Sequence, residues 1–191
     1  MTTNIAKREP LLPNAIFATM IFVGTEIMFF MGLISAFMVI KASANTDEFI
    51  VPASVRLPVY TTGFNTLVLF LSGFFLFRSL QLLSRGSDRA KVETNFLIAI
   101  ILGLFFVGYQ GYEWLNLMKW GMTLHTNLFT GLFYLIIGSH GIHALCAILV
   151  MAILYARLRS QKLTKVQLQA MVIFWLFVVG IWPVLYGLVY F

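Results

Sequence analysis

Five long apolar segments determine what this sequence of 191 residues can fold into. They cover about 15–40, 59–83, 93–118, 127–156 and 167–190. Each is close to or longer than the roughly 20 residues that an α-helix needs to cross a bilayer, and short polar connectors separate them. Hydrophobic residues make up 60% of the chain and charged residues only 10%, against about 25% charged in soluble domains. The sequence therefore predicts an all-α polytopic membrane protein, a bundle of five transmembrane helices in one domain that spans 1–191.

The charges between these segments predict how the helices are oriented. Ten of the 13 Lys and Arg residues are expected on one side: Lys7, Arg8, Arg78, Arg85, Arg89, Lys91, Arg157, Arg159, Lys162 and Lys165. Only Lys41, Arg56 and Lys119 are expected on the other. Because cytoplasmic loops carry the excess of Lys and Arg, we expect the N-terminus inside and the C-terminus outside. The same rule explains the net charge of +6 without a nucleic-acid partner.

Glu26 lies in the middle of the first apolar segment, far in sequence from any Lys, Arg, His or Asp. An ionisable group at this depth costs about 2.5–3.5 kcal/mol on insertion scales, so we expect it to face a helix, a cavity or a partner. Two interpretations stay open: a buried functional carboxylate, or a protonated group that only helps packing. A small proton-coupled transporter using Glu26 is one function of the first kind. Gly24 and Gly32 predict close approach of another helix to this segment.

The other polar residues inside the segments form a small set: Asn65, Gln110, Glu113, His140 and His143. Gln110 and Glu113 are three residues apart, as are His140 and His143, so each pair is predicted to share a helix face. The Glu and His pairs are candidates for one inter-helix polar network. No catalytic set is apparent, and the Glu-x-x-His motif of di-iron bundles is missing. We therefore expect no metal site in this chain, with satisfied core histidines as the simpler explanation of His140 and His143.

Five segments of the sequence, in order, resemble subunit III of the haem-copper oxidases. They are Glu26–Gly32, Asn65–Thr66 with Ser72–Gly73, Gly103–Phe106 with Gln110–Trp114, Gly138–His143, and Trp175, Phe177, Val178 and Trp182. The length is similar to that of the short bacterial form with five helices. Two positions depart from the family pattern, because Leu176 and Val179 stand where the family usually has His and Asp.

The resemblance implies an accessory subunit that carries no haem or copper of its own. Such a subunit packs against oxidase subunit I in the bacterial plasma membrane, binds phospholipid in a cleft, and supports proton uptake and the durability of O₂ reduction. Haem and copper are then expected in the partner subunits. By the same resemblance, Glu26 is the family's buried carboxylate, and Glu113, His140 and His143 belong to its polar network. A relative that serves a nitric oxide reductase is an alternative.

Overall fold

The computed structural model describes residues 13–43 and 58–191, and all of its regular structure is helical. The five helices are α1 (Asn14–Ser43), α2 (Val59–Ser84), α3 (Arg89–Lys119), α4 (Leu128–Arg159) and α5 (Lys165–Tyr190). Each is long and apolar enough to cross a membrane, which confirms the predicted fold class. Lys7, Arg8 and Arg56, used above to predict orientation, lie outside the described residues.

Several helices run beyond the apolar segments because polar residues cap them in the connectors. Asp88 accepts a hydrogen bond from the backbone N–H of Ala90, so α3 begins before the apolar segment predicted from about residue 93. Asn127 and Thr164 form capping boxes at the starts of α4 and α5. Each cap satisfies backbone N–H groups that a helix start leaves unpaired.

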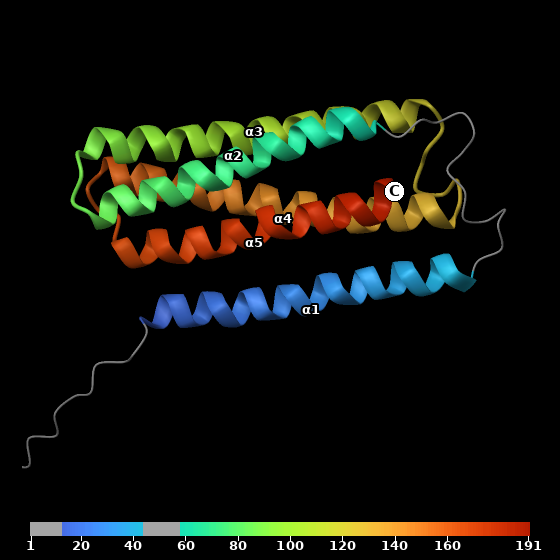
Figure 1. Cartoon of the computed structure of the whole chain (residues 1–191), viewed down its shortest axis with the longest axis horizontal. Helices are drawn as coiled ribbons and strands as arrows, with labels where there is room; N and C mark the ends of the chain where they lie inside the picture. Colours follow the sequence, from blue (N-terminus) through green and yellow to red (C-terminus); the bar gives the residue numbers. More distant parts are fainter. Residues whose placement is uncertain (1–12, 44–57) are drawn as a thin grey trace, which may run out of the picture.

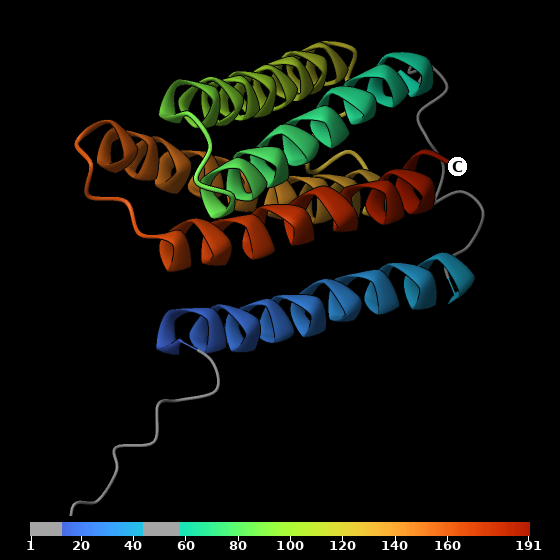
Figure 2. The same ribbon diagram turned by 60° about the vertical axis from the view of Figure 1, so that its left-hand side comes forward.

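The helices are arranged as a group of four, α2 to α5, with α1 alongside (Figure 1). Within the described chain α1 contacts α5 and α4 and neither α2 nor α3, and the turned view shows it as a separate layer (Figure 2). Only two side chains of α1, Phe30 and Phe37, are fully buried. We conclude that α1 is the helix with the least packing inside this chain.

Successive helices alternate in direction, so the ends of α2 and α4 lie beside the starts of α3 and α5 (Figure 1). The described cations therefore divide unequally between the two ends of the bundle. Eight of them lie at or near the end that holds the start of α1: Arg78, Arg85, Arg89, Lys91, Arg157, Arg159, Lys162 and Lys165. Lys41 and Lys119 lie at the opposite end.

Close helix packing occurs in α2, α3 and α5 and not where the glycines of α1 predicted it. A Cβ placed on Gly24 or Gly32 would meet no atom of the described chain within 4 Å. A Cβ on Gly103 of α3 would instead lie 3.2 Å from the ring of Trp175. The expectation for α1 is therefore wrong within this chain, because α1 approaches its neighbours through large side chains such as Phe30.

Two tryptophans, seven residues apart on α5, attach that helix to α2. Nε1 of Trp175 donates to the hydroxyl of Ser72 at 3.1 Å, and Nε1 of Trp182 donates to Thr66 at 2.9 Å. Ser72 in turn donates to the carbonyl of Ala99 on α3 at 2.7 Å. Both indoles are fully buried, so these bonds fix the relative height of α2, α3 and α5.

Candidate functional site: polar contacts between helices

Glu26 of α1 finds its partner on α4. Its Oε2 lies 2.7 Å from Nε2 of His143, and both side chains are largely buried. The rings of Phe29 and Phe30 lie beside the imidazole, with the ring centres of Phe30 and His143 5.3 Å apart. The sequence predicted a partner for Glu26 but did not identify it.

The other nitrogen of His143 fixes how many protons this pair holds. Nδ1 lies 2.7 Å from the carbonyl oxygen of Ser139, and a carbonyl only accepts, so Nδ1 carries a hydrogen. A hydrogen bond between Oε2 and Nε2 then requires one further hydrogen, on either the carboxyl or the ring. The Glu26–His143 pair therefore holds one shared proton, as a neutral pair or as an ion pair.

Glu113 lies in a second cluster, near the end of α3. Both of its carboxylate oxygens accept hydrogen bonds from α2, one from Thr61 and one from Thr62, the latter at 2.9 Å. The carboxylate is buried. Two threonine hydroxyls thus supply the hydrogen-bond partners of Glu113, whereas an imidazole supplies the partner of Glu26.

The Glu113 cluster extends to α5 through Gln110. Nε2 of Gln110 donates to the hydroxyl of Tyr190 at 3.1 Å, and that hydroxyl lies near Thr62 and Glu113. We use the name Glu113 cluster for Thr61, Thr62, Gln110, Glu113 and Tyr190. Sequence reasoning missed Thr61, Thr62 and Tyr190.

Asn65 and His140 are buried apart from both carboxylates. Nδ2 of Asn65 donates to the carbonyl of Phe106 on α3 at 3.0 Å. His140 stacks on Trp182 of α5, with ring centres 4.9 Å apart, and neither of its ring nitrogens has a hydrogen-bond partner in the described chain.

The predicted single network of glutamates and histidines is therefore not formed in this arrangement. His143 contacts Glu26 on α1, whereas His140 packs against Phe106 of α3 and Trp182 of α5. Glu113 bonds to α2 and to neither histidine. Two residues three positions apart point in directions that differ by about 60°, and in a bundle this is enough for them to face different neighbours.

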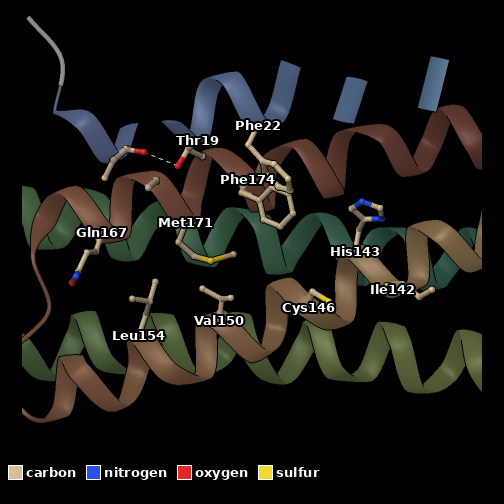
Figure 3. Close-up of a pocket in the computed structure, with 12 residues that line it drawn as sticks. Thr19, Phe22, Ile142, His143, Cys146, Val150, Leu154, Gln167, Met171 and Phe174 are labelled. Atoms are coloured by element: carbon tan, nitrogen blue, oxygen red, sulfur yellow. Dashed lines mark hydrogen bonds between the residues drawn. The ribbon is translucent and has the colours of Figure 1, made fainter. Parts of the chain in front are cut away.

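An apolar groove of about 560 Å³ runs between α1, α4 and α5. His143 and Ile142 lie at one end of it, and Gln167 and Leu154 lie toward the other (Figure 3). Phe22 and Phe174 face each other between α1 and α5, with ring centres 5.5 Å apart. The groove therefore places the Glu26–His143 pair beside an apolar space.

The structure gives a packing reason for one of the two departures in α5. Val179 is buried, and a Cβ on Gly73 of α2 would lie 3.3 Å from its Cγ2. An apolar side chain at 179 thus fills the space left by Gly73. Leu176 is partly exposed, although its Cδ2 also lies near Gly73.

Within residues 13–43 and 58–191, no three His, Cys, Asp or Glu side chains come together as metal ligands would. The chemistry these residues do offer is hydrogen bonding and the holding of protons inside the bilayer. The fold and these contacts define a polytopic helical membrane protein whose ionisable side chains join helices to one another.

Comparison with known proteins gives the family. The family model described as cytochrome c oxidase subunit III matches residues 13–191, and this chain belongs to that family. A probable cytochrome c oxidase subunit 3 of Mycobacterium leprae is 32% identical and covers 94% of this chain and 89% of its own. Cytochrome c oxidase subunit 3 of Synechocystis is 28% identical, with 91% and 74% covered, and that of Corynebacterium diphtheriae is 26% identical, with 100% and 99% covered.

Proposed function

We propose that this chain is the non-catalytic subunit III of a respiratory haem-copper terminal oxidase in a bacterial plasma membrane. It packs against subunit I and supports proton uptake and catalytic durability while the complex reduces O₂ to water. Family membership over residues 13–191 is the observation that carries the proposal. Haem and copper belong to the partner subunits.

The Glu26–His143 pair is the group through which this chain supports proton uptake. It holds one proton between a carboxylate and an imidazole 2.7 Å apart. Loss of that proton leaves a carboxylate against a ring lone pair, and gain of another leaves an uncompensated charge in a medium where charges are poorly solvated. The proton of the pair can lie on either Oε2 or Nε2, and the surrounding charges decide which.

The groove between α1, α4 and α5 binds an acyl chain of a phospholipid. Its volume of about 560 Å³ is in the range of sites that hold small ligands, about 300–1,000 Å³, and its wall is apolar. Arg157 lies one turn beyond Leu154, and Lys165 lies two residues before Gln167, so cations are near that end of the groove for a phosphate group. A bound lipid in this position shields the Glu26–His143 pair and fills the space beside α1.

The start of α1 faces the cytoplasm, because the end of the bundle that holds it carries eight of the described Lys and Arg residues. The phosphate-binding end of the groove is then on the cytoplasmic side.

The test is the purified oxidase complex with Glu26→Gln in this chain. A glutamine still donates a hydrogen bond to Nε2 of His143 but cannot release or gain a proton at physiological pH, so the variant separates proton chemistry from packing. We expect normal initial O₂ reduction, followed by inactivation after several-fold fewer turnovers, with fewer protons taken up or pumped per electron.

Glu93→Gln is the matched control. Glu93 pairs with Arg89 on the surface of α3 at 3.0 Å, outside the groove. Wild-type durability and proton stoichiometry in both variants would overturn the role of Glu26. Complete loss of initial O₂ reduction with Glu26→Gln would overturn the accessory role.

A further inference from the structure

A second cavity of about 210 Å³ lies between α3, α4 and α5. Gln110 and Trp114 of α3 line one side, His140 and Gly141 of α4 line the other, and Trp182 of α5 lines it as well. The indole of Trp114 packs over Gly141, where a Cβ would lie 3.0 Å from the ring. Ile142 of α4 lines both this cavity and the groove of Figure 3.

Residues that carry polar atoms without a protein partner line this cavity. Among the described residues, four of the five buried side-chain nitrogen and oxygen atoms that lack a hydrogen bond belong to residues that line it. They are Nδ1 and Nε2 of His140, Oε1 of Gln110 and Nε1 of Trp114. His140 and Gln110 are 1% and 3% exposed. Leaving such atoms unpaired costs about 1–3 kcal/mol each, so their gathering on one cavity indicates a polar occupant.

We propose that this cavity is a binding site for a small cluster of ordered water molecules held by His140, Gln110 and Trp114. The indole N–H and one imidazole N–H donate, while the amide oxygen and the other imidazole nitrogen accept. A buried water makes about three hydrogen bonds, so four protein atoms are enough for about two waters that also bond to each other.

Other occupants fit the site less well. An acyl chain would leave all four polar atoms unpaired. A drug-sized organic ligand needs about 300 Å³ or more. A metal ion would find one imidazole and no carboxylate or thiolate among the residues that line the cavity. The size of the cavity and the four unpartnered atoms on the residues that line it therefore favour water.

The water cluster would join His140 to the Glu113 cluster. Gln110 donates to the hydroxyl of Tyr190, which lies near Thr62, and Thr62 donates to the carboxylate of Glu113. With water between His140 and Gln110, hydrogen bonds run from the middle of α4 through Gln110 of α3 to Tyr190 of α5. This inference does not depend on the proposed role in an oxidase.

The experiment is X-ray radiolytic footprinting of the purified complex that contains this chain, in which bound water generates hydroxyl radicals beside the residues it touches. Trp182 and Trp175 form a matched pair. Both are fully buried and both donate to an α2 hydroxyl, but only Trp182 lines the cavity. We expect Trp182 to be oxidised several-fold faster than Trp175, and equal rates would overturn the proposal.

His140→Phe tests which side chain holds the water. It removes both ring nitrogens and should lower the rate at Trp182 to that at Trp175, whereas an unchanged rate would contradict the assignment to His140. If this variant does not assemble, a cryo-electron microscopy map of the unmodified complex decides. Rounded density about 2.7–3.2 Å from a nitrogen of His140 supports the proposal. Elongated hydrocarbon density in the cavity, or no density, overturns it.

Discussion

Oε2 of Glu26 lies 2.7 Å from Nε2 of His143, and this contact is a polar link between α1 and the four-helix group. Within the described chain, the buried side chains of α1 are the two rings of Phe30 and Phe37. A helix held by so few groups depends on each of them. The Glu26–His143 pair therefore contributes to the docking of α1, in addition to the proton role proposed above.

Glu26→Leu should weaken α1 docking in a way that Glu26→Gln does not. Leucine leaves Nε2 of His143 buried without a partner, which costs about 1–3 kcal/mol, while glutamine keeps a hydrogen bond. Denaturant titration of the purified protein in mixed micelles measures the difference. Equal free energies of unfolding for the two variants would show that the hydrogen bond does not hold α1.

Phe30→Ala should destabilise the protein by about 3 kcal/mol or more, the usual cost of removing a buried phenylalanine side chain. Phe30 is fully buried and its ring lies against His143 and Phe177. Met31→Ala is the control, because Met31 is the next residue and is 58% exposed. The same titration compares them, and similar losses for both would mean that α1 does not dock through Phe30.

Gly103→Ala should destabilise the bundle by about 1–3 kcal/mol through overpacking. The added Cβ would lie 3.2 Å from Trp175, whose indole is held by Ser72, and 3.4 Å from Ile148. Gly24→Ala is the matched change in α1, where no described atom lies within 4 Å, and it should be neutral or stabilising by up to about 1 kcal/mol. Opposite signs in thermal unfolding are the expected result. A stabilising Gly103→Ala would contradict the packing of α3 against α5.

Ser72→Ala should cost about 1–3 kcal/mol, since it removes a hydroxyl that donates to Ala99 and accepts from Trp175. Ser139→Ala is the control. Within the part of the chain that the structure describes, that hydroxyl donates to the carbonyl of Leu135 in its own helix, so its loss should change the free energy of unfolding by about 0.5 kcal/mol or less. Indistinguishable variants would mean that the serine does not join α2 to α3 and α5.

Cys146, the one cysteine of the chain, reports on the groove. It is exposed and lines the groove beside His143. If an acyl chain lies there, a membrane-permeant maleimide should label Cys146 slowly in the native complex and several-fold faster after delipidation, with added phospholipid restoring the protection. Labelling at the same rate before and after delipidation, measured by mass spectrometry, would contradict lipid binding in the groove.

The number, type and approximate bounds of the helices follow from the sequence, because spans of this length with so few charges have few alternatives in a bilayer. The need for a Glu26 partner followed from the cost of an ionisable group at that depth. The sequence did not identify which residue is the partner of Glu26, because His140 and His143 share one predicted helix face. Only the packing of α4 against its neighbours decides that His143 faces α1.

The contacts of Glu113 show another kind of residue that the sequence did not identify. Thr61 and Thr62 near the start of α2 and Glu113 near the end of α3 come together because the two helices run antiparallel. Hydroxyl groups give no charge signal in an apolar segment, so the sequence did not identify them. The glycines of α1 misled for a related reason: small residues permit close approach but do not indicate which helix comes near.

The measurement to make first is an optical spectrum of this chain, tagged and purified from its native membrane in a mild detergent. If it is subunit III, haem absorbance copurifies with it and is lost when the same chain is separated from its partners, because the described part of the chain brings together no metal-ligand set. A homogeneous, colourless preparation from native membranes, free of partner subunits, would contradict the assignment to an oxidase complex.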